Sequence, residues 1–210
     1  MDEPPRRRRR SSAEETREHI LDSAADVLRR SGLAQARTKE IAREAGYSEA
    51  TLYKHFEDKT DLLLAVMRHR FPPFVDVLAE LPARVGRGEV RETLAEVAAK
   101  AVEFFRHGTP LLGALFADPE LLRRHREELR QRGAGPLNVN RALADYLRAE
   151  RDLGRIRADT DPEAVASLLV GACFQRGFFE AFSGGLGDFP PVDRFAADLV
   201  AALPDIFQGR

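Results

Sequence analysis

The stretch that decides the fold is TKEIAREAGYSEATLYKHFEDKTDLL, which runs from Thr38 to Leu63. It contains two short segments with a helical pattern, residues 39–45 and 49–55, joined by a Gly-Tyr-Ser turn. Gly46 can take the left-handed conformation that ends a helix. Two helices joined by about three residues that include a glycine are typical of the helix-turn-helix, whose second helix enters the major groove of DNA.

The second helix of this pair carries a polar outer face that a core does not need. The apolar residues of the unit can face inward against the preceding helix: Ile41, Ala42, Ala45, Leu52 and Phe56. What remains outward is a set of hydrogen-bonding side chains around a small residue: Glu49, Ala50, Thr51, Tyr53, Lys54 and His55. Phosphate oxygens accept from Thr, Tyr, Lys and His, and Lys and Thr also contact base edges. By composition alone, the same face could be the solvated side of an ordinary helical bundle.

Two hydroxyl residues and one alanine support the DNA-binding interpretation. Thr38 and Ser48 are favourable N-cap residues, and the helix N-termini and hydroxyls there are available to backbone phosphates. Ala50 is small and would let the second helix come close to the floor of the groove. The residues therefore predict a DNA-binding unit in which the second helix reads the groove.

The stretch closely resembles the DNA-binding unit of TetR-family transcriptional regulators, the tetracycline-repressor-like proteins. The positions that carry the resemblance are Ile41-Ala42, Ala45-Gly46, Ser48, Thr51-Leu52-Tyr53, His55-Phe56, Lys59 and Leu62. At the level of this motif the resemblance covers roughly Thr16 to Met67. Over the remainder of the chain only the length and the helical layout are similar.

The resemblance implies roles for individual residues in contact with an operator. The residues implied to hold the phosphate backbone are Thr38, Tyr53, His55 and Lys59, and those near or at base edges are Thr51 and Lys54. The sequence departs from the common pattern at Tyr47, where a small aliphatic residue is usual, and at Glu49-Ala50, where a pair ending in glycine is frequent. These departures leave the operator sequence open.

The rest of the chain reads as helices separated by Gly and Pro. Besides the two in the motif, the expected helices cover residues 14–31, 58–70, 89–106, 110–116, 119–132, 137–151, 161–183 and 192–207. Strand-like alternation with β-branched residues is absent, so the sequence predicts an all-α fold. We expect a disordered basic arm over residues 1–12, an N-terminal three-helix helix-turn-helix domain over 13–57, and a larger helical domain for effector binding and dimerisation over 58–210.

Composition narrows the class of protein further. The 210 residues are 43% apolar and carry a formal net charge of −1, so they allow a core but give no global signal for nucleic acid. A single cysteine, Cys173, argues against a disulfide framework and favours a cytoplasmic location. The sequence shows no secretory signal and no uncharged apolar run of roughly 18 residues, so we expect no membrane partner. It also lacks a recognisable nucleophile constellation and a Gly-rich phosphate loop, which predicts no enzyme, cofactor or metal site.

Arg6 to Arg10 form a run of five arginines near the N-terminus. Residues 1–12 have no apolar residue after Met1, so burial cannot offset their ordering entropy, and we expect a mobile segment. Two interpretations stay open. The run is either a solubilising tail or an arm that tracks phosphates or the minor groove and raises DNA affinity in a salt-dependent way.

The larger domain holds more aromatic surface than closing a small bundle requires. We predict a site for a mainly apolar small-molecule effector, and a filled core of packed phenylalanines is the alternative. The predicted lining is Phe104, Phe105, Leu111, Leu115, Phe116, Leu122, Phe174 and Phe178, with His107, Gln175 and Arg176 as polar anchors. Gln175 and Arg176 could equally make intersubunit contacts. Cys173 is expected to be a buried small apolar residue, with redox sensing as the alternative.

The expected assembly is a homodimer on double-stranded DNA. The candidates for the dimer seam are the helices 137–151 and 161–183. Small residues in 161–183 allow two helices to approach closely. The bundle between subunits could also include 192–207. We therefore predict a one-component regulator, a repressor that a small molecule releases from a pseudo-palindromic operator. The alternatives are a TetR-like activator or repressor that lacks a ligand, and an all-α binding or scaffolding module without operator recognition.

Overall fold

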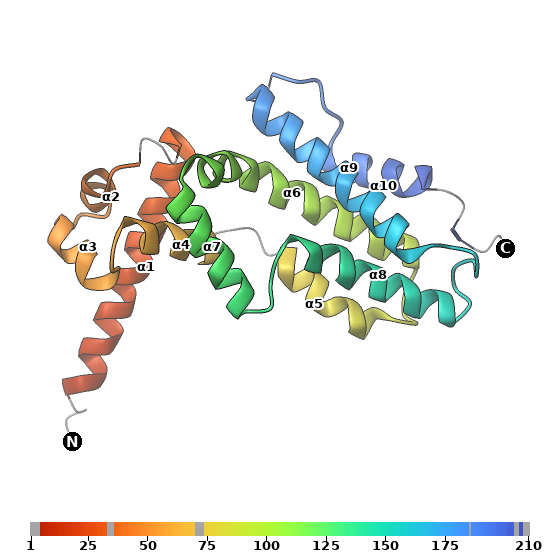
Figure 1. The fold of residues 1–210 in the computed structure, drawn as a ribbon, viewed down its shortest axis with the longest axis horizontal. Coiled ribbons are helices and arrows are strands. Elements are labelled where there is room, and N and C mark those ends of the chain that lie inside the picture. The colour runs from red at the N-terminus through yellow and green to blue at the C-terminus, as the bar shows by residue number, and fades with distance from the viewer. Residues whose placement is uncertain (1–4, 33–35, 70–73, 185, 204–205, 208–210) are drawn as a thin grey trace. The chain divides into compact units, whose positions relative to one another are not determined.

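The computed structural model describes residues 5–32, 36–69, 74–184, 186–203 and 206–207. Within these ranges the chain is helical, and its only β-type pairing is an isolated bridge between Ile156 and Phe207. The helices, labelled in Figure 1, are α1 (Pro5–Ser31), α2 (Thr38–Glu44), α3 (Glu49–His55), α4 (Lys59–His69), α5 (Phe74–Arg84), α6 (Val90–Ala117), α7 (Pro119–Gln131), α8 (Pro136–Asp152), α9 (Pro162–Ser183) and α10 (Val192–Ala202). The predicted all-α class is confirmed.

The chain forms two compact units, each with its own hydrophobic core. The first unit comprises Met1–Phe71 and Pro110–His125, and the second comprises Pro72–Thr109 and Arg126–Arg210. A domain boundary at residue 57 is therefore too early. Helix α4 and the segment where α6 meets α7 belong with the helix-turn-helix because their apolar residues are buried in the same core.

The core of the first unit holds the helix-turn-helix in place. Its buried residues include Ile20, Leu21, Ala24, Val27 and Leu28 of α1; Ile41, Ala42 and Ala45 around α2; Leu52 and Phe56 at α3; Leu62 to Val66 of α4; and Leu115 and Leu121. The predicted inward-facing residues of α2 and α3 are thus confirmed. Leu52 is the buried residue among the seven of α3, so the opposite side of this short helix faces water.

The turn between α2 and α3 follows the predicted chemistry at two positions and departs from it at a third. Gly46 has φ +73°, a conformation that side chains with a Cβ rarely adopt. Ser48 caps α3, since its Oγ accepts from the Thr51 N–H at 3.1 Å. The prediction that Thr38 caps α2 is wrong: α2 begins at Thr38, and the N-cap position is Arg37, whose side chain makes no capping bond. The Thr38 hydroxyl is therefore used elsewhere.

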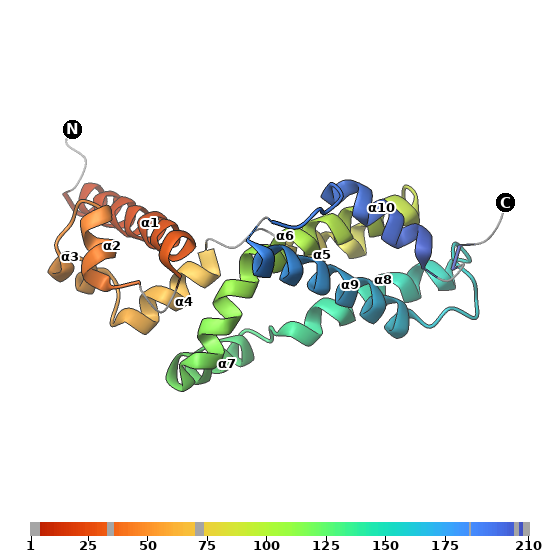
Figure 2. The same cartoon turned by 90° about the horizontal axis from the view of Figure 1, so that it is seen from above.

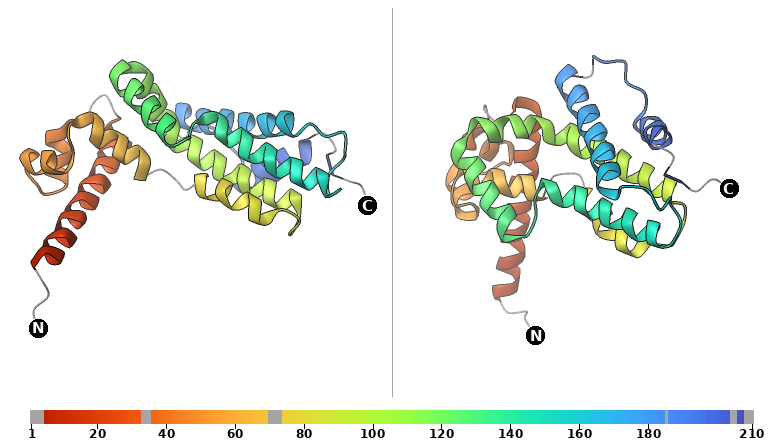
Figure 3. Two further views of the ribbon diagram at one scale, coloured as in Figure 1. Left: turned by 60° about the horizontal axis from the view of Figure 1, so that its bottom comes forward. Right: turned by 45° about the vertical axis from the view of Figure 1, so that its right-hand side comes forward.

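Helix α1 is longer than the sequence pattern predicts. The expected disordered arm over 1–12 is wrong for residues 5–12, which continue the helix to Pro5. Proline is favourable at the first helical position, arginine is a good helix former, and lengthening an existing helix avoids the cost of nucleation. Figure 3 shows the first turns of α1 projecting beyond α2 and α3.

The second unit is a bundle of α5, most of α6, α8, α9 and α10. Helices α8 and α9 lie side by side in Figures 1 and 2, with α5 against α8 and α10 against α9. Its core contains Phe74, Leu81, Leu94, Val97, Leu143, Leu147, Val165, Leu169, Cys173 and Val200. Cys173 is fully buried there, as predicted, and burial raises the pKa of its thiol to about 12.

Two features of this unit differ from the sequence-based helices. Helix α5 is absent from the prediction, in which Pro72-Pro73 ends the preceding helix. Its Pro82 lies inside the helix, close to the C-terminal end at Arg84. Helix α6 continues through Gly108 and Pro110, where the sequence pattern predicts two helices. Pro110 lacks an N–H, and the Thr109 hydroxyl bonds back to the Phe105 carbonyl at 2.7 Å beside it.

Helices α6 and α9 meet backbone to backbone at Gly177. A Cβ at this glycine would lie 2.7 Å from both the Arg106 nitrogen and the Phe105 Cβ, which is closer than side chains pack. The contact therefore requires a residue without a side chain. It sets the spacing at which the aromatic residues of α6 and α9 meet.

Helix α9 is also long and apolar enough, by length and composition, to pass a test for a membrane span. One side of it, which includes Val165, Leu169 and Cys173, forms the core of the second unit. On that side α9 is a core helix of the second unit.

Candidate nucleic-acid interface

Helix α3 presents the face that the sequence predicts. Ala50, Tyr53 and Lys54 are exposed, with Tyr53 44% accessible, whereas Thr51 and His55 are half-buried. The Ser48 and Thr51 hydroxyl oxygens lie 2.9 Å apart at the start of the helix. The outer side of α3 thus offers a hydroxyl group, an ammonium group and a phenol around one methyl side chain.

The Thr38 hydroxyl lies at the centre of a chain of polar contacts between α2 and α3. It donates to Glu49 Oε1 at 2.5 Å, and the Tyr53 hydroxyl donates to Thr38 Oγ1 at 3.4 Å. Two of the four residues implied to hold phosphates, Thr38 and Tyr53, are therefore brought together. Glu49, which the sequence analysis places only on the outer face, is the acceptor at the end of this chain.

Three further cationic residues lie beside the polar contacts of Thr38, Glu49 and Tyr53, and the prediction from the motif does not include them. An open hollow of about 720 Å³ at the starts of α2 and α3 is lined by Arg37, Lys39, Glu40, Ala42, Arg43, Tyr47, Ser48 and Glu49. Arg37, Lys39 and Arg43 are all exposed. Their placement around the predicted helix 39–45 was the available signal: Arg37 precedes α2, Lys39 lies in its first turn and Arg43 in its last.

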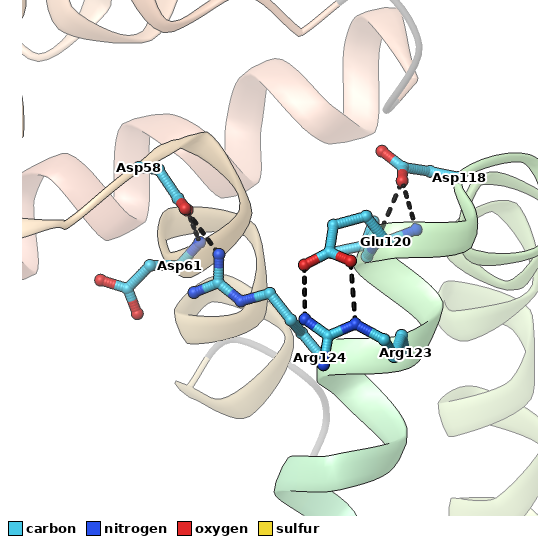
Figure 4. A network of polar contacts seen from close by, with 7 residues as sticks. Asp58, Asp61, Asp118, Glu120, Arg123 and Arg124 are labelled. Atoms are coloured by element: carbon cyan, nitrogen blue, oxygen red, sulfur yellow. Dashed lines mark hydrogen bonds and ion pairs between the residues drawn. The ribbon is translucent and has the colours of Figure 1, made fainter.

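Lys59 begins α4, and the start of that helix is fixed by a polar network (Figure 4). Asp58 Oδ1 accepts from the Asp61 N–H at 2.7 Å, and Asp61 Oδ2 accepts from the Glu57 N–H at 3.0 Å. Arg124 of α7 reaches Asp58 Oδ2 at 2.6 Å. The backbone that carries Lys59 is thereby held from two sides.

The same network explains the titration of Asp58. Burial alone would raise the pKa of this carboxyl, but the hydrogen bonds from the Asp61 N–H and the Arg124 guanidinium lower it overall. Asp118 caps α7 in a similar way, since its Oδ1 accepts from the Glu120 and Leu121 N–H groups at 3.1 and 3.0 Å. Capping at both helices fixes the position of Arg124 relative to α4.

The residues predicted to bind an effector are divided between the two units. Phe104, Phe105, Phe174 and Phe178 lie in the second unit, together with His107, Gln175 and Arg176. Leu111, Leu115, Phe116 and Leu122 lie in the first unit, where Leu115 is buried in the core and Phe116 is 69% exposed. The predicted set thus draws residues from both units.

Part of the aromatic set does lie together in the second unit. The ring centroids of Phe104 and Phe105 are 5.4 Å apart, and Phe105 meets Phe174 edge to face at 5.3 Å. Phe74 of α5, which the sequence analysis does not include, lies 5.4 Å from Phe104. These four residues, Phe74, Phe104, Phe105 and Phe174, form what we call the aromatic group.

The predicted polar anchors have differing surroundings. Arg176 is only 6% exposed; its guanidinium bonds Glu180 at 2.5 Å and the Pro190 carbonyl at 2.6 Å, and lies over the rings of Phe189 and Phe195. This arginine joins α9 to the segment before α10. Gln175 is exposed on α9, and His107 Nδ1 lies 2.7 Å from the Glu103 carbonyl of its own helix. Among the described residues, no group of three or more His, Cys, Asp or Glu residues is placed to hold a metal ion.

Comparisons with known proteins agree with this geometry. Residues 20–66 match the family model described as bacterial regulatory proteins, tetR family. The chain is 24% identical over 148 residues to the uncharacterised HTH-type transcriptional regulator YvkB of Bacillus subtilis, covering 70% of this chain and 74% of YvkB. It is 41% identical to the regulator SrpR of Pseudomonas putida, but over 61 residues, which is 29% of each chain.

Solved structures extend the likeness of the fold beyond the motif. A structure described as a TetR-family transcriptional regulator of Mesorhizobium loti has a TM-score of 0.69 at 20% identity, covering 90% of this chain and 95% of that one. The regulator FadR of Bacillus subtilis in complex with stearoyl-CoA has a TM-score of 0.62 at 17% identity, covering 88% of this chain and 95% of FadR.

A helix-turn-helix with an exposed polar recognition face, joined to a separate helical unit, defines a DNA-binding transcriptional regulator. Within that class, residues 20–66 match the TetR-family model, and the helical fold of the rest is similar to that of solved TetR-family regulators, as the sequence resemblance implied.

Proposed function

We propose that this chain is a repressor that binds a pseudo-palindromic operator as a homodimer and leaves it when a mainly apolar small molecule binds the second unit. The exposed face of α3, with Tyr53 and Lys54 directed outward over a buried Leu52, is the observation that carries the DNA-binding half of the proposal. A two-fold dimer would place its recognition helices about one DNA turn apart, roughly 34–36 Å.

The exposed side of α9 supports the dimer. Its outer face carries Leu168, Phe178, Phe179 and Phe182, of which Phe182 is 83% exposed, and Ala164 and Gly171 lie among them. Apolar rings on a helix surface are more stable when a second copy of the chain covers them than when they are exposed to water. Small residues between them allow two α9 helices to approach closely, with the neighbouring α8 completing the seam.

The aromatic group supports an effector site in the second unit. Four phenylalanines from α5, α6 and α9 meet there, and aromatic walls with few polar groups are typical of sites for apolar ligands. FadR, which resembles this chain in fold, was solved with stearoyl-CoA. The effector site proposed here is narrower than the eleven-residue set expected from sequence, since it uses Phe104, Phe105 and Phe174 with Phe74.

A repressor of this kind would act in the cytoplasm, without catalysis. Release from DNA requires only that the effector binds more tightly to a conformer whose recognition helices no longer match adjacent half-sites. An activator or a ligand-free repressor would share the DNA-binding face, and a scaffolding module would not need it. An assay of DNA binding therefore distinguishes a regulator from a scaffolding module. An assay of the response to ligand distinguishes the proposed repressor from an activator or a ligand-free repressor.

The test begins with selection of bound duplexes from random-sequence DNA by the purified full chain. A two-fold symmetric consensus is expected, and recovery of no consensus would overturn the DNA-binding half. Apolar compounds, including long-chain acyl thioesters, are then screened for a rise in melting temperature together with release of the selected duplex.

Matched variants test where such a compound binds. Phe105→Leu changes the aromatic group while keeping an apolar side chain, and Phe116→Ala removes an exposed ring in the first unit. We expect Phe105→Leu to weaken the response to the compound by about tenfold and Phe116→Ala to leave it unchanged. An equal loss in both variants would favour the wider set, and compounds that stabilise the protein without releasing DNA would contradict induction.

A further inference from the structure

We propose that Glu49 is a specificity-determining residue that reads a cytosine at the position of the operator half-site facing the first turn of α3. The inference rests on the proposed DNA-binding function and adds one base to it. It concerns a residue at which this chain departs from the common pattern of its family, so the resemblance assigns Glu49 no role.

The argument starts from the protons of two hydroxyl groups. A threonine or tyrosine hydroxyl has one proton, whereas an ionised carboxylate only accepts. The Thr38 hydroxyl donates its proton to Glu49 Oε1 at 2.5 Å, and the Tyr53 hydroxyl donates its proton to Thr38 Oγ1 at 3.4 Å, so both protons are engaged within the protein. In the free protein neither proton is available to a phosphate.

Contact with DNA therefore forces an exchange of partners. If Thr38 turns its proton to a phosphate oxygen, Glu49 loses its hydroxyl donor while more negative charge arrives nearby. A carboxylate left without a donor in a partly dehydrated interface is costly. This cost applies to every DNA sequence unless the groove itself supplies a donor to Glu49.

Cytosine supplies that donor. Its N4 amine is a hydrogen-bond donor in the major groove, and Glu or Asp is the side chain that accepts from it. Glu49 is the first residue of α3, and the first residues of a recognition helix are those that contact base edges. Ala50 beside it is exposed and small, which lets the backbone approach the groove closely enough for a carboxylate to reach a base.

The result is discrimination with two parts. A half-site with cytosine at this position replaces the donor that Glu49 loses. Guanine and thymine present no donor at this edge, and adenine presents its N6 donor beside the N7 acceptor, which repels a carboxylate. The three cations in the same hollow, Arg37, Lys39 and Arg43, attract the phosphates of any DNA sequence. Glu49 therefore suppresses binding to non-cognate DNA as well as favouring the cognate half-site.

The experiment compares three proteins on duplexes selected by the wild type. Glu49→Ala removes the acceptor, Glu49→Gln keeps the shape and replaces the carboxylate with an amide, and Glu40→Gln is the control, since it removes one negative charge from the same hollow on α2. For wild type, replacing the selected cytosine should weaken binding about tenfold. For Glu49→Ala this penalty should fall below about twofold, with scrambled DNA bound more tightly, and Glu49→Gln should shift the preference toward adenine.

The outcomes separate the inference from the function on which it rests. If wild type selects no consensus, the regulator proposal fails. If wild type selects a consensus but both Glu49 variants keep the same penalty at every position, or lose affinity by one common factor, Glu49 only positions Thr38 and the inference is overturned. Glu40→Gln should change all affinities by a common factor; a loss of preference at the same position in this control would also overturn it.

Discussion

Helices α3 and α9 both expose aromatic side chains to a similar degree, yet their surroundings differ. Tyr53 on α3 is 44% exposed and Phe179 on α9 is 47% exposed. The ring on α3 ends in a hydroxyl and lies beside Lys54, whereas the exposed rings on α9 carry no polar atom, and Phe178 stacks on Phe182 at 5.8 Å. In the proposed function these different neighbours match different partners: a nucleic acid for α3 and a second copy of the chain for α9.

The largest expected effect comes from placing a charge on the α9 face. Leu168→Arg should convert the dimer into a monomer, because two uncompensated cations would be buried in the seam. Operator affinity should fall more than about a hundredfold, since two linked half-sites become one. Sedimentation and gel shifts measure both. Ala197→Arg on the exposed side of α10 is the control and should change neither; a dimeric Leu168→Arg would move the seam away from α9.

A second test asks whether cations outside α3 supply much of the DNA affinity. Without Arg6 to Arg10, acidic residues outnumber basic ones in residues 1–70. If these five arginines contact phosphates, changing all of them to Gln should reduce the steepness of log K against log salt by up to about 4.5 per subunit, or about 9 for the proposed dimer. Replacement by Lys should preserve most of the slope. An unchanged slope in the Gln variant would make the run a solubilising segment.

Among the residues implied to contact DNA on α3 and at the start of α4, the expected effects differ with the kind of contact. Tyr53→Phe and Lys59→Ala should weaken binding to all sequences by about tenfold, because each removes a bond to a charged oxygen. Lys54→Ala should instead change the preferred base, at about 1–3 kcal/mol if its contact is bidentate. Titrations on cognate and scrambled duplexes distinguish the two. Equal losses on both duplexes for Lys54→Ala would reassign Lys54 to the phosphate backbone.

The stability of the start of α4, which carries Lys59, should change when Asp58 is replaced. Asp58→Ala removes the cap of α4 and should cost about 1 kcal/mol of unfolding free energy. Asp58→Asn keeps the cap and loses only the ion pair with Arg124, which is partly screened by water and should cost less than about 0.5 kcal/mol. Denaturant titrations of both variants measure the difference, and equal losses would show that the ion pair dominates.

The same pair predicts a pH dependence. The pKa of Asp58 is lowered in the folded protein, so its stabilisation is present above the ordinary value of 3.8 and is lost as the pH falls through the lower folded value. The stability difference between wild type and Asp58→Ala should therefore be constant near neutral pH and narrow only in acid. A difference that already changes between pH 6 and 8 would point to another group.

The smallest expected effect lies on the buried side of α9. Burial raises the pKa of the Cys173 thiol to about 12, and the thiolate is the reactive form. The folded protein should therefore resist alkylation at pH 8 for hours, while the urea-unfolded protein reacts within minutes. Fast alkylation of the native protein would favour redox sensing over a packing role.

Sequence alone was sufficient where the determinants are local. Gly46, Ser48 and the inward residues of α2 and α3 could be predicted because a left-handed glycine, a cap and a helical period are each set within a few residues. Helix α5 also had its signal, since Phe74, Val77, Leu78 and Leu81 are buried at helical spacing, but the flanking prolines obscured it.

Long-range contacts could not be predicted in this way. Arg176 reads from sequence as an anchor for a ligand or a second subunit, yet its guanidinium is held by Glu180, the Pro190 carbonyl and two rings, an arrangement that depends on where the chain returns after α9. The role of Glu49 depends likewise on Thr38, eleven residues earlier. Both residues required the fold to bring their partners near.

The close approach of α6 and α9 at Gly177 has a genetic consequence. Every amino acid other than glycine adds a Cβ there, and that atom would lie 2.7 Å from Phe105, a member of the aromatic group. The added side chain would push α6 and α9 apart at the place where the effector is proposed to bind. Random mutants selected for constant expression of the controlled genes should therefore include changes at Gly177. These variants should still fold and dimerise, because separating the two helices has the same effect as the inducer in its absence.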